Sequence, residues 1–100
     1  MSYIKPTDVH SPKLRWVLIA VLDEAKEGDC ALALGRWDGE VTLAMRWNGH
    51  DDNPIGNPQS RGLPTYFRVP AKYHEALLTS GTLSPDKLIL ARSFILEPSP

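Results

Sequence analysis

The sequence predicts an α+β fold: a mainly antiparallel five-stranded sheet with one packed helix, in a chain that assembles as a dimer. Three observations predict this fold. Several short apolar runs are bounded by Gly, Pro, Asn, Asp and Ser, which is typical of strands joined by turns. The pair Asp38-Gly39 separates two of these runs, and both residue types tolerate the positive φ angles of a tight hairpin. One segment, after Pro70, has the apolar spacing of a helix instead.

Length and composition indicate one domain over residues 1–100. Of the 100 residues, 42% are hydrophobic and 23% are charged, and the formal net charge is −1. This apolar content suffices for one core, and the combination of low hydrophobicity and high net charge that marks disordered chains is absent. A basic excess is absent too, which argues against nucleic acid as a partner. Residues 1–13 contain two prolines and are expected to form an irregular lead-in.

Cysteine usage and the apolar runs predict a cytoplasmic protein. Cys30 is the only cysteine, which excludes an intrachain disulfide and a thiolate metal cluster and suits a reducing compartment. The longest continuous apolar run, Trp16 to Leu22, has seven residues, whereas a membrane-spanning helix needs about 20. The first residues also lack the apolar core of a signal peptide. We therefore expect no membrane contact.

Three strands are predicted in the first half of the chain. Residues 14–22 are apolar without helical gaps, so we expect a strand that is buried on both faces. Residues 30–37 and 40–47 form the hairpin around the Asp-Gly turn. Counting outward from this turn pairs Leu34 with Leu43, and the same register runs to the ends of both strands.

The predicted register sorts the hairpin side chains by size. One face carries large apolar residues: Leu32, Leu34, Val41, Leu43, Met45 and Trp47. The other face carries small residues: Ala31, Ala33, Gly35, Thr42 and Ala44. The sorting supports the register, because a slip by one residue would mix the two sets. We expect the small face to admit a bulky element, most simply a helix.

The second half of the chain is predicted to contain a loop, two strands and the helix. Residues 65–69 form a short strand, and residues 71–80 form a helix that ends at Gly81. Residues 88–96 are expected to form a final strand that is buried on both faces. A helix of about ten residues spans about 15 Å and cannot cover both faces of the sheet. We therefore expect a homodimer through sheet or edge-strand contacts.

A functional site is predicted on residues 48–64 and their flanks. This segment has 17 residues without a strand or helix pattern, and such long loops in small domains are usually functional. Guanidinium groups bind carboxylates and phosphates, and aromatic rings line binding sites. The expected ligand-binding residues are Arg46, Trp47, Arg61, Tyr66 and Arg68. They suggest a non-enzymatic binding or adaptor domain for a small anionic ligand or a protein partner, without a cofactor.

Two other functions fit the same sequence. A small metal-assisted hydrolase would use His50, Asp51 and Asp52, whose side chains suit Zn²⁺, Mn²⁺ or Mg²⁺. A purely structural, inhibitor-like interaction protein would present a flat apolar surface. No nucleotide-binding fingerprint is present, and we assign no catalytic residue. Arginines beside aromatic residues could stack nucleic acid bases, but the near-neutral charge argues against that partner.

Residues 56–67, GNPQSRGLPTYF, and residues 44–49, AMRWNG, carry a resemblance to known proteins. In these two stretches the chain resembles small uncharacterised bacterial proteins of the kind encoded on mobile gene cassettes. The resemblance implies a stand-alone bacterial protein. It brings no known activity and no catalytic residue.

Overall fold

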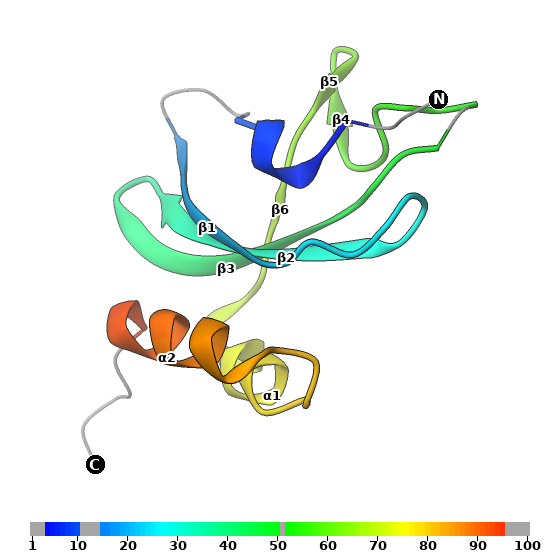
Figure 1. Cartoon of the computed structure of the whole chain (residues 1–100). Coiled ribbons are helices and arrows are strands. Elements are labelled where there is room, and N and C mark those ends of the chain that lie inside the picture. The colour runs from blue at the N-terminus through cyan, green and yellow to red at the C-terminus, as the bar shows by residue number, and fades with distance from the viewer. Residues whose placement is uncertain (1–3, 11–14, 51, 96–100) are drawn as a thin grey trace.

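The computed structural model describes residues 4–10, 15–50 and 52–95. A 3-10 turn and a short hairpin lie on one side of the main sheet, and two helices lie on the other (Figure 1). The elements are η1 Pro6–Asp8, β1 Trp16–Asp23, β2 Cys30–Trp37, β3 Glu40–Trp47, β4 Gln59–Ser60, β5 Leu63–Pro64, β6 Phe67–Arg68, η2 Ala71–Tyr73, α1 His74–Leu78 and α2 Pro85–Phe94. The predicted α+β class with an antiparallel sheet is confirmed.

The main sheet has four strands in the order β1-β2-β3-β6, and β4 pairs with β5 in a separate two-stranded hairpin. The described sheet therefore has one strand fewer than the sequence suggested. The short strand expected over residues 65–69 is present as β6. The strand expected over residues 14–22 is present as β1, and residue 14 lies outside the described residues.

The central hairpin forms in the predicted register. Asp38 and Gly39 have φ angles of 52° and 88°, the left-handed values that a two-residue hairpin turn needs. Leu34 pairs with Leu43, and the register continues without a break from Trp37 and Glu40 to the far ends of both strands. Local turn chemistry and the alternation of side chains were sufficient to determine this part of the fold.

The predicted strand over residues 88–96 is wrong: this segment is most of helix α2, and residue 96 lies outside the described part of the chain. The side chain of Ser84 accepts a hydrogen bond from the backbone N–H of Lys87, and Pro85 occupies the first helical turn. Both are helix-start signals. The sequence alone favours a strand here, because an apolar run without clear periodicity fits a buried strand as well as a buried helix.

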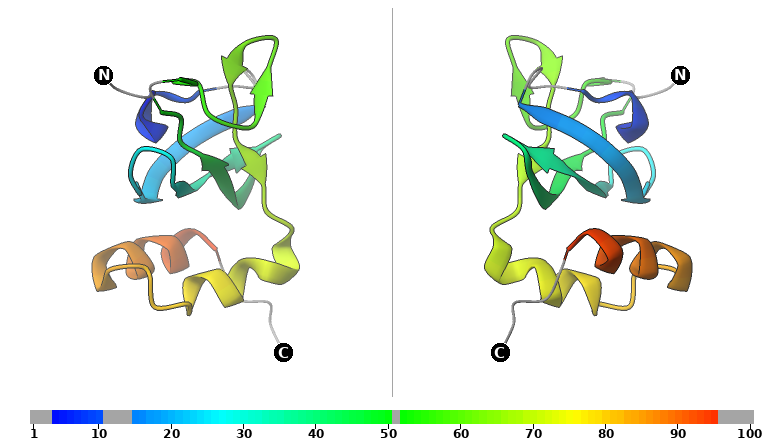
Figure 2. Two further views of the ribbon diagram at one scale, coloured as in Figure 1. Left: turned by 90° about the vertical axis from the view of Figure 1, so that its right-hand side faces the viewer. Right: turned by 90° about the vertical axis from the view of Figure 1, so that its left-hand side faces the viewer.

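The helix expected over residues 71–80 is shorter and divided. A 3-10 turn, η2, leads directly into the five residues of α1. Thr79 then ends the helix, and its hydroxyl donates to the carbonyl oxygen of Glu75 at 2.8 Å. Two short helices, α1 and α2, therefore form the helical layer that lies below the sheet in both views of Figure 2.

The helical layer covers the face of large apolar residues. The buried residues of this core are Leu22, Leu32, Leu34, Leu43, Val69, Leu78 and Ala91. They join the three central leucines of the hairpin to one residue of each helix. The helix that we expected on the small face is therefore on the opposite face, because leucine side chains leave the larger apolar area to bury.

The face of small residues is covered by aromatic rings and the N-terminal turn. Its buried core consists of Val9, Trp16, Ala33, Ala44 and Tyr66. A methyl group at Gly35 would collide with the Trp16 ring, which shows how closely this ring approaches the sheet. One chain thus covers the centre of both faces of its own sheet, so no second copy is needed to cover a whole face. The homodimer itself stays a prediction.

The β1 edge of the sheet is irregular, and the opposite edge, β6, is only two residues long. β1 is an edge strand in which only Trp16 and Leu22 are buried, so its expected burial on both faces is wrong. Its pairing with β2 shifts register twice, after Leu18 and after Val21. Such bulges discourage pairing with a further strand. None of the helices in the described residues is long and apolar enough to cross a bilayer.

Candidate functional site

The segment 48–64 folds back against the end of β3. Trp47 and Asn57 exchange two backbone hydrogen bonds of 2.7 and 3.0 Å. Beyond them β4 and β5 form a hairpin that projects away from the main sheet (Figure 1). Arg61 and Gly62 at the turn have φ angles of 53° and 79°, as in the Asp-Gly hairpin. The segment is therefore an ordered extension of the sheet.

Arg46 anchors this segment from the small-residue side of the sheet. Its side chain is 1% exposed. Nη1 donates to the carbonyl oxygen of Thr65 at 2.7 Å, and Nη2 donates to the carbonyl oxygens of Ile55 and Trp47. Burial lowers the pKa of Arg46, and no carboxylate of the described residues pairs with it. The guanidinium thus satisfies backbone carbonyls from both ends of the segment.

A pocket of about 400 Å³ opens where this segment meets β2, β3 and β6. Its lining residues are Cys30, Met45, Arg46, Trp47, Asn57, Pro58 and Phe67. The strand register explains their meeting: Cys30 is paired with Trp47, and Met45 is paired with Phe67. Cross-strand partners share a face, so these four side chains lie on the face of large residues.

Two aromatic side chains border the pocket and face solvent. Trp47 is 56% exposed and Phe67 is 59% exposed. They extend the large-residue face of the sheet along β3 and β6, beyond the part of this face that α1 and α2 cover. Arg46 is adjacent to Trp47 and therefore leaves β3 on the opposite side, which agrees with its contacts to Thr65 and Ile55. Its charge is directed away from the pocket.

The thiol of Cys30 is the one sulfhydryl of the pocket, and its environment keeps it protonated. Burial raises the pKa of Cys30, and the nearby carboxylates of Asp29 and Asp23 raise it further. A protonated thiol is a weak nucleophile. Cys30 therefore contributes a polarisable, mostly apolar surface to the wall of the pocket.

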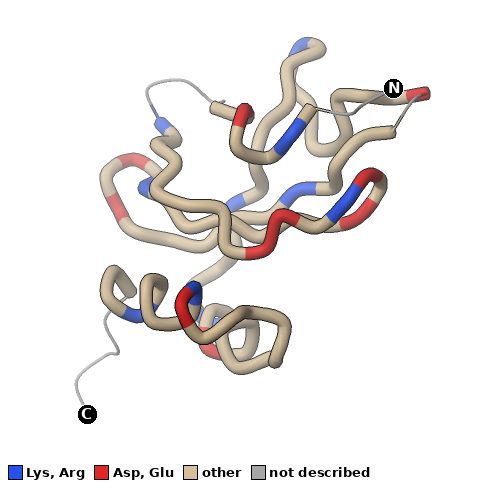
Figure 3. The backbone as a smooth tube through the Cα atoms, viewed as in Figure 1, with Lys and Arg blue, Asp and Glu red and all other residues tan. Residues whose placement is uncertain are grey.

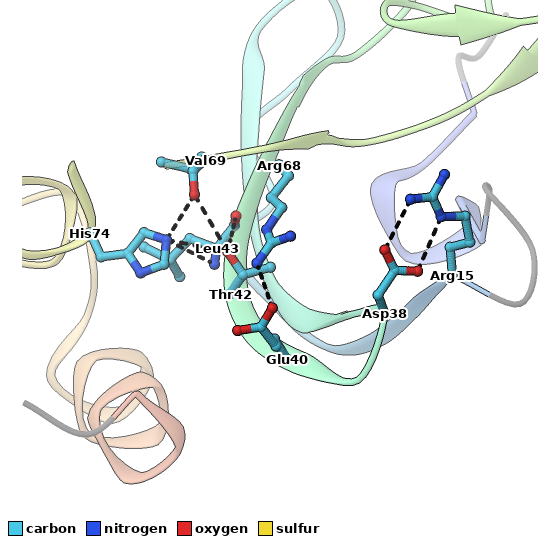
Figure 4. Close-up of polar contacts among 8 residues, drawn as sticks. All are labelled: Arg15, Asp38, Glu40, Thr42, Leu43, Arg68, Val69 and His74. Atoms are coloured by element: carbon cyan, nitrogen blue, oxygen red, sulfur yellow. Dashed lines mark hydrogen bonds and ion pairs between the residues drawn. The ribbon is translucent and has the colours of Figure 1, made fainter. Parts of the chain in front are cut away.

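The five predicted ligand-binding residues do not come together in one site. Trp47 borders the pocket, and Arg46 borders it with its charge turned to the other side. Tyr66 is buried, and its hydroxyl donates to the carbonyl oxygen of Pro6 at 2.7 Å; burial raises its pKa. Arg61 is exposed at the hairpin turn, and Arg68 pairs with Glu40 at 3.5 Å (Figure 4).

Five lining residues were not among the predicted ligand-binding residues: Cys30, Met45, Asn57, Pro58 and Phe67, of which Asn57 and Pro58 lie in the predicted segment 48–64. The predicted register could have indicated three of them, since Cys30 and Met45 share a face with Trp47 and Phe67 follows in a strand. The missing information was where the helices end over this face. The spacing of residues along β3 shows which side chains share a face, but it does not show how much of that face the helices cover.

The residues of the metal alternative are placed only in part. Asp51 lies outside the described residues. His50 accepts a hydrogen bond at Nδ1 from the backbone N–H of Asp52 at 3.2 Å, so this ring nitrogen is engaged in a local turn. Within the described residues no group of three or more His, Cys, Asp or Glu side chains is arranged to hold a metal ion.

Comparisons with family models, curated proteins and solved structures found no match. The resemblance to proteins of mobile gene cassettes therefore stays a prediction.

Proposed function

We propose that this chain is a non-enzymatic binding module that takes a small, mainly apolar molecule in the pocket beside Trp47. The observation that carries the proposal is the pocket itself. Its volume of about 400 Å³ falls within the range of small-molecule sites. It is lined mostly by apolar and aromatic side chains, and Asn57 lies at its rim as a side chain that can form a directional hydrogen bond.

The exposed aromatic rings supply the driving force for binding. Trp47 and Phe67 together leave roughly 230 Å² in water, when each side chain is taken as about 200 Å². Covering this area would yield roughly 6 kcal/mol before the costs of association are subtracted. Because 1 mM corresponds to about 4 kcal/mol and the costs of association reduce the gain further, we expect a small ligand to bind with millimolar affinity.

The ligand that fits best is uncharged, in contrast to the anionic ligand expected from the sequence. Arg46 donates to backbone carbonyls, Arg68 pairs with Glu40, and Arg61 lies on the projecting hairpin. An anion that entered the pocket would thus lose its hydrating water, and no guanidinium would be in place to form compensating hydrogen bonds. An aromatic or cycloaliphatic molecule with a single hydrogen-bonding group avoids this cost.

The chemistry of the pocket supports binding without catalysis. The raised pKa of Cys30 keeps the thiol protonated, and none of the three histidines, His10, His50 and His74, borders the pocket. Nucleophilic catalysis needs an activated nucleophile with a base in hydrogen-bond reach. The pocket is also hollow, whereas the inhibitor-like alternative calls for a flat surface.

Titration with indole, followed by NMR, tests the proposal. We expect saturable shifts of the Met45 methyl group and of the Trp47 side-chain N–H. Trp47→Ala should weaken binding at least about tenfold, which corresponds to about 1.4 kcal/mol. Ile89→Ala removes an exposed apolar side chain from α2, outside the pocket, and should leave the affinity unchanged. Absence of saturable shifts, or equal affinity in Trp47→Ala, would contradict the proposal.

A further inference from the structure

A second hollow of about 400 Å³ lies beside the pocket, between β6, η2 and α1. It is bordered by Phe67, Pro70, Tyr73, Ala76 and Leu77, which we call the Tyr73 surface. Met45 and Phe67 line both hollows, so the Tyr73 surface is continuous with the binding pocket. Every residue named in the Tyr73 surface is apolar or aromatic.

The Tyr73 surface combines projecting rings with a hollow. Phe67 is 59% exposed and Tyr73 is 52% exposed. Pro70 and Ala76 are exposed beside them, and their small side chains allow another surface to approach the backbone closely. The projecting rings of Phe67 and Tyr73 and the hollow that they border therefore lie on the same face of the molecule. A surface of this kind can be complementary to itself across a two-fold axis.

The charges around the Tyr73 surface are compensated within the chain except at Lys72. Arg92 donates to both carboxylate oxygens of Glu75, at 3.0 and 2.8 Å, and Arg68 reaches Glu40 at 3.5 Å. Lys72 places its ammonium group 5.3 Å from the centroid of the Tyr73 ring. Acidic and basic positions are interspersed along the described chain (Figure 3), and the net charge is −1. In a two-fold contact the two Lys72 ammonium groups are therefore the charges that must be kept apart, at the rim of the interface.

The other surfaces of the sheet are less suited to self-association. One face is covered by the helices and the other by η1, Trp16 and Tyr66. Edge strand β1 is interrupted by two register shifts, which disfavour continuous pairing with a strand from another molecule. The Tyr73 surface is the apolar region that these elements leave open.

We propose that the Tyr73 surface is a two-fold interface between two copies of this chain. The exposed apolar area of the Tyr73 surface is consistent with a second copy as its partner. Phe67 and Tyr73 together expose roughly 220 Å², at about 200 Å² per aromatic side chain. A standard interface buries about 800 Å² per subunit, of which about 65%, or roughly 520 Å², is apolar in homodimers. The two rings supply about two fifths of this apolar area, and the exposed Pro70 and Ala76 and the partly buried Leu77 adjoin them and add to it.

The interface adjoins the binding pocket without coinciding with it. Phe67 is the wall between the two hollows, whereas Trp47 borders only the pocket and Tyr73 only the second hollow. The dimer predicted from the sequence thus acquires a specific surface, which includes Phe67 of edge strand β6 but rests mainly on side chains of η2 and α1. Association and ligand binding are consequently separable by mutation.

Sedimentation velocity and light scattering across the micromolar range test this interface. The wild-type chain is expected to have twice its 11.1 kDa mass at the upper end of the range. Tyr73→Glu places a carboxylate in the contact and should weaken association at least about tenfold. Ile89→Glu is the matched control, because Ile89 is 69% exposed on α2 and outside both hollows.

Three outcomes would overturn the interface. These are a wild-type chain that stays monomeric throughout the range, a Tyr73→Glu chain that stays dimeric, and loss of the dimer in Ile89→Glu. Should Tyr73→Glu fail to fold, as judged by circular dichroism, Ala76→Glu introduces the same charge on the exposed side of α1. Trp47→Ala should remain dimeric, so failure of the ligand proposal and failure of the interface are distinguishable.

Discussion

The two faces of the sheet are covered in different ways. On the small-residue face, Trp16 and Tyr66 pack against alanines and Gly35, and the Tyr66 hydroxyl is fixed to the carbonyl of Pro6. On the large-residue face, two short helices cover the central leucines and leave the end at Met45 and Trp47 open. Small side chains let rings approach the backbone closely, whereas large side chains hold the covering layer away.

This difference separates a face that contributes to stability alone from a face that contributes to stability at its centre and to binding at its open end. Substitutions on the small-residue side, or under the helices, should lower the free energy of unfolding. Substitutions at the open end of the large-residue face should change binding or association and leave the fold intact. Four changes, each measured by urea denaturation, test this difference.

Arg46→Leu should have the largest effect, a loss of about 3–5 kcal/mol in the free energy of unfolding. The substitution keeps a long apolar side chain but leaves the carbonyl oxygens of Thr65 and Ile55 buried without their donor. Arg68→Leu is the control: its guanidinium lies in an exposed ion pair and should contribute less than about 1 kcal/mol. Equal effects would show that Arg46 does not anchor the segment.

Gly35→Ala should cost about 2–3 kcal/mol by overpacking. The added methyl group meets the Trp16 ring and the carbonyl oxygen of Val17. Gly62→Ala separates this clash from backbone strain, because Gly62 has a φ of 79° but open space around it. That variant should cost about 1 kcal/mol. If Gly35→Ala lowered the free energy of unfolding less than Gly62→Ala, the close approach of the Trp16 ring would not explain why glycine is needed at position 35.

His74→Ala should cost about 1–3 kcal/mol. The buried ring lies between the sheet and α1, and its Nε2 is 2.9 Å from the carbonyl oxygen of Val69 and 3.3 Å from the hydroxyl of Thr42 (Figure 4). The contact with the carbonyl requires Nε2 to carry the proton and donate. His74→Gln offers an amide donor and should recover part of the loss. His50→Ala, on an exposed turn, should change stability little.

The smallest expected effect is pH dependence from two exposed ion pairs. Hydrogen bonds from Arg15 hold the pKa of Asp38 below its ordinary value, and hydrogen bonds from Arg92 do the same for Glu75. A carboxyl group with a lowered pKa in the folded state stabilises the fold above its unfolded pKa of about 4. This stabilisation disappears as the pH falls through the lowered folded value.

Urea midpoints measured between neutral and acidic pH check the sign of this effect. At neutral pH the double variant Asp38→Asn, Glu75→Gln should unfold at a slightly lower urea concentration than the wild-type chain. The difference should shrink toward zero as the pH falls below both pKa values. A gap that widened in acid would contradict the assigned direction of the shifts.

Local patterns predicted the centre of the fold well and its periphery poorly. The Asp-Gly turn and the alternation of large and small side chains determined the hairpin register residue by residue. The same reasoning was wrong for residues 88–96, most of which form helix α2. In a continuous apolar run, the spacing of apolar residues does not distinguish a buried strand from a buried helix. In the candidate site, Trp47 was predicted, and the predicted register already placed Met45 on the same face. The pairing of β3 with β6, which puts Phe67 beside Met45, came only from the structure.

The sequence alone determined the hairpin and the two chemically distinct faces of its strands. The tertiary structure determined which element covers each face, where the helices stop, and that Arg46 donates to the carbonyl oxygens of the segment around Trp47. The physical reason is the range of the forces involved. Turn and register depend on neighbouring residues, whereas coverage of a face depends on the competition of all apolar surfaces of the chain for the same area.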